Sequence, residues 1–377
     1  MYTKAILTVP LLAIVFLLTS ATAMAQTVPF AHDGQRLNDQ SSAIQAMFRT
    51  VWGDLAAERW VDERNTELAA AQTGHVVRIA YFASGVPTFG PASEPGMFML
   101  GLREHGYVPG ENVTIDWRFG EGQNERLAGL AAELAQLSLD AIAVSDTQAV
   151  LAIQQAMPTT PIVITMVSDP VGAGLVASLE RPGGNVTGVA GLDPKLSAKR
   201  LELLTQALPG VSQVAVLRNA GNPSSAGPLR DLAAAAETLH IRLISMDVRA
   251  SEDLPSAFEA ATGDGAEAII GISDILFASP ANRAQLIQLA ERNHLPMMHQ
   301  SRPIVDEGGL MSFSPRTGAG ARRAADYLDR IVKGAKPADL PMGVPTDLEL
   351  VINLRGAEAI GIDVPAGVLA QASEVLR

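Results

Sequence analysis

Short Val- and Ile-rich runs that alternate with helical patterns constrain this chain more than any other feature of its sequence. The first set of runs comprises Val77–Phe82, Val113–Arg118, Ala141–Ser145, Ile162–Val167 and Val186–Ala190. Helices are expected between them at about 94–105, 124–137, 147–156 and 171–179. Apolar runs of this length, separated by amphipathic helices, are typical of βα units in a parallel sheet.

A second set of runs repeats the same rhythm after a longer predicted helix at about 196–207. Its members are Val214–Arg218, Ile241–Asp247, Ala268–Ile272, Pro296–His299 and Leu310–Phe313, with helices near 225–238, 253–261 and 281–293. The chain then closes with a helix at about 317–333, a strand at Leu348–Asn353 and two short helical pieces. Two sets of this kind predict two α/β lobes, and 377 residues suit two domains.

The first 25 residues have the pattern of a secretory signal peptide. Lys4 precedes the apolar run Ala5–Leu18, and Ala23–Ala25 is a small-x-small cleavage site. The alternative is a membrane anchor, but the run is shorter than the roughly 20 residues that span a bilayer. We therefore expect export to the periplasm. We expect residues 26–75 to form an N-terminal appendage, partly helical, that packs on the main body or makes an oligomer contact.

Composition excludes several classes of function. The chain has no cysteine, which removes disulfides, thiolate nucleophiles and Cys-ligated metals. Its 28 Lys and Arg stand against 40 Asp and Glu, a net charge of −12, so no nucleic-acid partner is expected. The six histidines form no HxxxH or HExxH pair, and neither a GxSxG elbow nor a GxxxxGK[ST] loop is present. We expect no metal, no cofactor and no enzymatic activity.

Small polar side chains follow the predicted strands, where open parallel sheets bind ligands. Many of them stand at a helix start, so each is either a ligand contact or simply an N-cap. The candidate ligand-binding residues are Ser84, Ser145, Thr147, Ser168 and Asp169 in the first lobe, and Asn219, Asn222, Ser273 and Asp274 in the second.

One stretch imitates a dinucleotide-binding motif. Residues 172–177 match the relaxed pattern GxGxxA, and Asp193 follows at about the expected distance. Four residues separate the preceding strand from the first glycine, and the predicted helix is short. An exported NAD-dependent oxidoreductase is therefore the less favoured alternative function.

Several further motifs resemble one known family. They are GLREHGYVPGENV (101–113), SDPV (168–171), GLVASL (174–179), RPGGNVTG (181–188), KRLELL (199–204), GGLMS (308–312), KGAKPADLP (333–341) and ELVINL (349–354). Together they resemble bacterial ABC-transporter substrate-binding proteins, in the branch related to tryptophan and tyrosine uptake. The resemblance covers roughly residues 76–377. The appendage at 26–75 and the segment Arg218–Pro223, which replaces Asn-Pro-x-Asn-Pro, depart from the family pattern.

The resemblance implies a periplasmic binding protein of the first structural type. Such a protein has two Rossmann-like lobes with parallel sheets, joined by a multi-strand hinge. We expect lobe 1 to comprise 76–188 and about 314–342, and lobe 2 to comprise 189–313 and about 343–377. The implied partners are a small-molecule ligand and an ABC permease in the inner membrane, and the protein is expected to be a monomer.

The expected ligand is an amino acid or a similar zwitterion or carboxylate. Hydroxyls and helix-start amides would hold its carboxylate, and Asp146, Asp169 or Asp274 could take its ammonium group. Phe89 or Phe277 could stack on an apolar side chain, although core packing is the alternative role for each aromatic ring. A sensory binding module that does not serve transport would share this fold and remains an open alternative.

Overall fold

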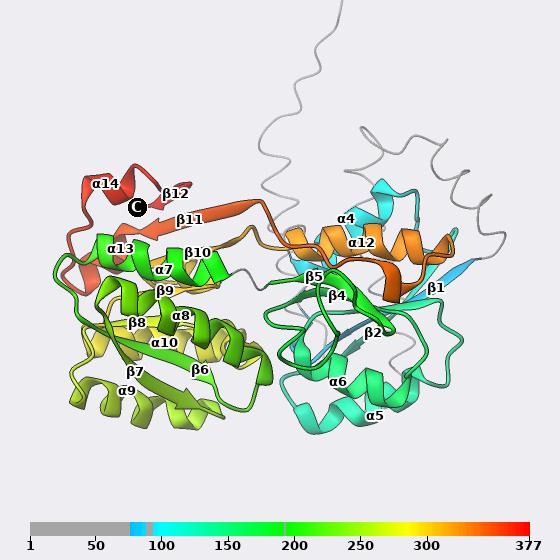
Figure 1. The fold of residues 1–377 in the computed structure, drawn as a ribbon, viewed down its shortest axis with the longest axis horizontal. Helices are drawn as coiled ribbons and strands as arrows, with labels where there is room; N and C mark the ends of the chain where they lie inside the picture. The colour runs from blue at the N-terminus through cyan, green and yellow to red at the C-terminus, as the bar shows by residue number, and fades with distance from the viewer. Residues whose placement is uncertain (1–75, 88–92, 192–193) are drawn as a thin grey trace, which may run out of the picture. The chain divides into compact units, whose positions relative to one another are not determined.

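A five-stranded parallel sheet forms the first half of the described chain. The computed structural model describes residues 76–87, 93–191 and 194–377, all within one compact unit. The predicted signal peptide and the appendage at 26–75 lie outside these residues. The sheet has the order β2-β1-β3-β4-β5 (Figure 1), with β1 at Val77–Ala83, β2 at Val113–Phe119, β3 at Ala141–Val144, β4 at Ile162–Val167 and β5 at Val186–Ala190.

Both faces of this sheet are covered by helices. Alternate residues of β1 point to opposite faces, so Ala80 and Phe82 join the core that contains α5 (Leu127–Leu134) and α6 (Thr147–Ala156). Tyr81 faces the other side, where it contacts Phe98 of α4 (Glu94–Glu104). The helix α12 (Ala319–Val332) packs on α4, β4 and β5, although it comes after the second sheet in sequence.

The second sheet has seven strands in the order β12-β11-β10-β9-β8-β6-β7. All its pairs are parallel except β10–β11. The strands are β6 (Gln213–Asn219), β7 (Arg242–Val248), β8 (Ala268–Gly271), β9 (Met297–His299), β10 (Met311–Pro315), β11 (Leu348–Asn353) and β12 (Glu374–Leu376).

Seven helices accompany the second sheet, and short 3-10 turns occur in both halves. The helices are α7 (Pro194–Ala207), α8 (Ala226–Leu239), α9 (Leu254–Gly263), α10 (Pro280–Arg292), α11 (Arg302–Asp306), α13 (Leu354–Ala359) and α14 (Ala366–Leu369). The turns are η1 (Asn124–Arg126), η2 (Pro223–Ser225), η3 (Ser251–Asp253), η4 (Ile275–Phe277) and η5 (Pro337–Asp339).

This architecture confirms the predicted α/β class with two mostly parallel sheets. The chain passes to the second sheet after β5, returns from β10 to α12, and passes again to β11 (Figure 1). Three connections therefore join the two halves, as a multi-strand hinge requires. The exact boundaries of the two lobes stay a prediction.

The predicted helix at 171–179 is wrong, because this segment is a series of turns. The Asp169 side chain and backbone carbonyl accept from the N–H groups of Gly172 and Ala173, which closes the chain into a turn. Gly174 then has φ of 72°, a left-handed conformation that interrupts a right-handed helix. The GxGxxA stretch therefore does not open a helix, so the N-terminal anion site of a dinucleotide-binding motif is missing.

Two short elements were not predicted from the sequence. α11 has only five residues, and β12 has three, so neither is long enough to show a period. In the described part of the chain, no helix combines the length and the hydropathy that crossing a bilayer requires.

Gly101 provides a test of the packing between α4 and α12. A Cβ at this position would lie 2.4 Å from the Arg322 carbonyl oxygen and 2.8 Å from the Ala325 Cβ. We expect Gly101→Ala to lower the free energy of unfolding by about 1–3 kcal/mol, as measured by denaturant titration.

Gly129 of α5 is the matched control, because it is exposed and a Cβ there would meet nothing within 4 Å. Gly129→Ala should stabilise the protein by about 0.5–1 kcal/mol through helix propensity. Equal effects of the two substitutions would contradict the described contact between α4 and α12.

Candidate ligand-binding site

Asp146 connects the ends of β1 and β3 in the first sheet. It is the N-cap of α6, and its Oδ1 accepts from the Ala149 N–H at 3.0 Å. Its Oδ2 accepts from the Ser84 N–H at 2.8 Å and from the Ser145 hydroxyl at 3.2 Å. Burial raises the pKa of Asp146, and these hydrogen bonds oppose that rise. The structure thus brings Ser84 and Ser145 to one carboxylate.

Asp169 closes the turn that follows β4. Its side chain is nearly inaccessible, and Oδ1 accepts from the Gly172 N–H at 2.7 Å. The exposed guanidinium of Arg230 approaches Oδ2 at 3.6 Å. Ser168 is half-buried and makes no side-chain hydrogen bond to another described residue. Asp169 therefore shapes its own loop, whereas the structure gives Ser168 no partner among the described residues.

Three of the candidates after the second sheet form one cluster. Asn219 and Asn222 each donate a side-chain N–H to the Asp274 carboxylate, at 3.0 and 2.6 Å. Asp274 is also the N-cap of η4 and accepts from the Leu276 N–H at 2.8 Å. Ser273 is exposed and lies outside this hydrogen-bonded cluster. The cluster joins the ends of β6 and β8.

Residues from the ends of both sheets also contact one another. The Thr147 and Ser224 hydroxyls lie 2.9 Å apart, and the Ser224 hydroxyl also donates to the Asp169 carbonyl at 3.3 Å. Gly227, at the start of α8, lies against the Asp169 carboxylate, because a Cβ there would be 2.2 Å from Oδ2. The candidate residues of the two halves therefore meet around Thr147 and Asp169.

Glu94 is a residue that the sequence patterns did not single out. It is the first residue of α4, and the Tyr81 hydroxyl lies 3.5 Å from its Oε2. Burial and the nearby Asp146 carboxylate raise the pKa of Glu94 to about 7. Ser93 and Pro95 mark a helix start in the sequence, but no local signal indicates that this helix begins beside Asp146.

The aromatic candidates have different outcomes. Phe277 is almost fully buried in the core of the second sheet, and its ring meets His299 edge-on at 6.3 Å. Phe277 therefore has the core-packing role and offers no surface for stacking on a ligand. Phe89 lies outside the described residues.

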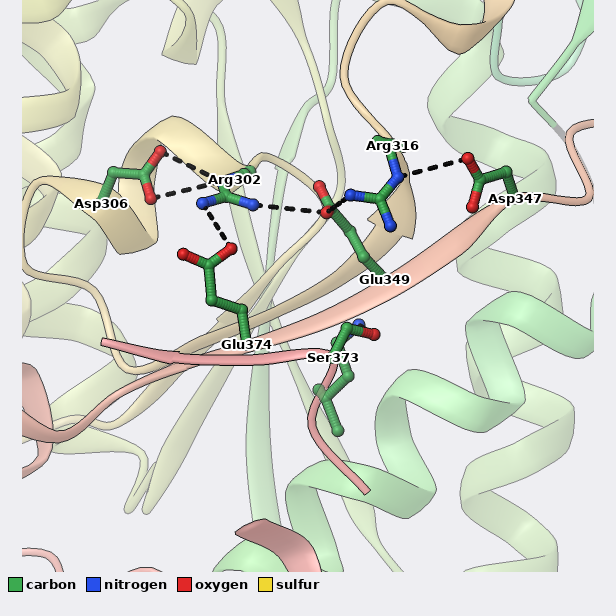
Figure 2. Close-up of polar contacts among 8 residues, drawn as sticks. Arg302, Asp306, Arg316, Asp347, Glu349, Ser373 and Glu374 are labelled. Atoms are coloured by element: carbon green, nitrogen blue, oxygen red, sulfur yellow. Dashed lines mark hydrogen bonds and ion pairs between the residues drawn. The ribbon is translucent and has the colours of Figure 1, made fainter. Parts of the chain in front are cut away.

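Arg302, which follows β9, is held in a network of ion pairs (Figure 2). Its guanidinium pairs with Glu349 at 3.3 Å and with Glu374 at 2.8 Å. Arg316 reaches the same Glu349 oxygen at 3.2 Å and also pairs with Asp347 at 3.2 Å. Glu349 is almost completely buried, so it depends on both arginines for charge compensation. These ion pairs hold the edge of the second sheet together, and they occupy the guanidinium of Arg302.

The described residues contain no group of three His, Asp or Glu side chains placed to hold a metal ion. The expectation that the protein uses no metal and no cofactor stays a prediction.

Comparison with known proteins identifies the family. The model of the ABC transporter substrate binding protein family matches residues 94–376, which is most of the chain, and the chain belongs to this family. Members bind small-molecule ligands outside the cytoplasm and work with ABC permeases.

Individual relatives agree with this assignment. The chain is 24% identical over 261 residues to the tyrosine-binding protein of Clostridioides difficile, covering 68% of this chain and 73% of the relative. A conserved domain protein from Vibrio cholerae matches in structure with a TM-score of 0.74 and 28% identity, over 80% of this chain and 99% of its own. An ABC domain from Streptococcus pneumonia in complex with L-Trp has a TM-score of 0.73 and 25% identity, with the same coverage.

Asp274 offers a test of how the cluster stabilises the second half. Asp274→Ala removes an N-cap and leaves two asparagine amides without their acceptor, so it should lower the free energy of unfolding by about 1–2 kcal/mol. The neighbouring Ser273→Ala is the control and should leave the stability unchanged. An equal urea midpoint for both variants would refute the structural role of the cluster.

Proposed function

We propose that this protein is the periplasmic solute-binding component of an ABC importer and that it clamps one small zwitterion, an amino acid, between its two lobes. The observation that supports this best is the meeting of strand-end residues from both sheets at Thr147, Asp169 and Ser224. A ligand between such edges can contact both halves at once, and it favours closure only through contacts that are better in the closed form.

The relatives favour an aromatic amino acid as the ligand. One relative is named for tyrosine, and a structural neighbour at 25% identity holds L-Trp. We therefore take L-tryptophan and L-tyrosine as the first candidates within the wider class of amino acids and similar carboxylates.

The candidate residues divide by role in this proposal. Ser84, Ser145, Thr147 and Ser168 supply hydroxyls at the first sheet, and Ser273 supplies one at the second. The carboxylates of Asp169 and Asp274 mainly position their loops, because backbone N–H and asparagine groups already occupy them. Asn219 and Asn222 act through the Asp274 cluster rather than as free amides.

The proposal has consequences for the cell. The protein would be exported by a signal peptide that is cleaved after residue 25. It would bind its ligand without chemical conversion and act as a monomer that delivers the ligand to an inner-membrane permease. A protein of this kind binds and releases its solute unchanged. Its ligand therefore stabilises the fold by mass action alone.

Binding of aromatic amino acids is directly testable by calorimetry and thermal unfolding. L-Tryptophan or L-tyrosine should bind with one site per chain, and at about 100 times the dissociation constant should stabilise the fold by about 2.7 kcal/mol. D-Allose serves as a control solute of a different class and should not bind.

Chromatography of the ligand after long incubation should recover it unchanged. A failure of both amino acids to bind, or conversion of either one, would contradict the proposed function. NAD should not shift the melting temperature, since the GxGxxA stretch lacks its helix.

A further inference from the structure

Two carboxylates lie together at the carboxyl edge of the first sheet. Asp146 caps α6 after β3, and Glu94 begins α4 after the loop that follows β1. The Tyr81 hydroxyl lies 3.5 Å from the Glu94 Oε2, and the Asp146 carboxylate contributes to the raised pKa of both groups. The pair thus stands where open parallel sheets bind their ligands.

Two buried hydroxyls near Tyr81 and Asp146 meet no geometric criterion for a hydrogen bond to a described residue. Ser84 and Thr165 are completely inaccessible, and neither hydroxyl meets hydrogen-bonding geometry with a described residue. The Ser84 N–H donates to the Asp146 carboxylate at 2.8 Å, which places Ser84 beside it, and the strand register places Thr165 on the same face of the sheet as Tyr81. Buried hydroxyls normally find partners, so two at one place point to a further polar group that belongs there.

The fold explains how Thr165 reaches Tyr81 from another strand. Tyr81, Ala143 and Val163 are register partners across β1, β3 and β4, and Thr165 is two residues beyond Val163 on the same face. The intervening Ala143 is small, which leaves room above β3 for the tyrosine ring. The carboxylates and hydroxyls therefore converge from three strands and two helix starts.

The site carries negative charge without a matching cation. Neither Glu94 nor Asp146 forms an ion pair with any Lys, Arg or His of the described residues. The other two acidic candidates differ, because Asp169 is approached by Arg230 and Asp274 is saturated by two asparagines and a backbone N–H. Only the Glu94–Asp146 pair combines uncompensated charge with unused hydroxyls.

We infer that Glu94 and Asp146, together with the hydroxyls of Tyr81, Ser84 and Thr165, form the seat for the primary ammonium group of the ligand. An ammonium group has three N–H donors and needs acceptors on several sides. Two carboxylates and three hydroxyl oxygens supply such a set. The inference rests on the proposed function and names the part of that site which selects amines.

The protonation of Glu94 gives this seat a pH dependence with a defined sign. Its pKa of about 7 lies above the usual value, so Glu94 is largely neutral below neutrality and ionised above it. Asp146 and Tyr81 face it, and the raised pKa of Tyr81 keeps that hydroxyl neutral throughout. Since an ammonium group favours the ionised carboxylate, affinity should rise about tenfold between about pH 6 and pH 8.

Glu94→Gln tests the inference, with L-tryptophan and its amine-free analogue 3-(indol-3-yl)propionate as probes. The amide keeps the shape of the neutral acid, so the variant should fold, and its melting temperature at pH 8 should not fall. Calorimetry at pH 8 should show L-tryptophan bound about tenfold or more weakly by the variant. The pH dependence of the remaining affinity should flatten, and binding of the analogue should not change.

Two further variants complete the experiment. Glu125→Gln, at an exposed glutamate of η1, is the matched control and should bind L-tryptophan as the unaltered protein does. Asp146→Asn retains an N-cap and should also weaken binding of the amine.

The outcomes separate the two claims. Unchanged affinity of Glu94→Gln for L-tryptophan, or equal affinity of the unaltered protein for tryptophan and its analogue, would overturn the ammonium seat and leave the proposed function standing. If neither L-tryptophan nor L-tyrosine binds the unaltered protein, the proposed function fails and the inference fails with it.

Discussion

Backbone N–H groups at the starts of helices and turns impose the first demand on the three aspartates at the ends of these strands. Asp146, Asp169 and Asp274 each accept from backbone N–H groups before they can serve a ligand. This requirement fixes the loops around the candidate site. It also separates acidic groups that are fully used within the protein from those that retain capacity for another partner.

The two sheet edges differ in whether their acidic side chains already have partners within the protein. The second sheet satisfies its acidic group, Asp274, with hydrogen bonds from the amides of Asn219 and Asn222, so this carboxylate is charged but fully partnered. The first sheet keeps Glu94 and Asp146 close together without a basic partner among the described residues. Two like charges in a partly buried position cost free energy. A bound ligand of opposite charge would remove that cost.

The sequence allowed much of the fold to be predicted, but much less of the site. Ile162–Val167, Val186–Ala190 and Leu348–Asn353 were predicted to the residue, because continuous apolar runs mark buried strands. The prediction of a helix at 171–179 was wrong because Gly174 has positive φ, which no local sequence feature indicates. Glu94 was missed because its position arises from tertiary packing of α4 on β1, which no local sequence feature indicates.

The connections beside the second sheet have a mechanical consequence. Arg316 donates its backbone N–H to the Asp347 carbonyl at 3.0 Å, and their side chains also pair. The chain that leaves β10 and the chain that enters β11 are therefore held together where they meet the second sheet. Gly343 is in turn hydrogen-bonded to β5, so each of these two connections has only a short stretch between its anchored ends. Connections this short favour rotation of one half against the other over sliding.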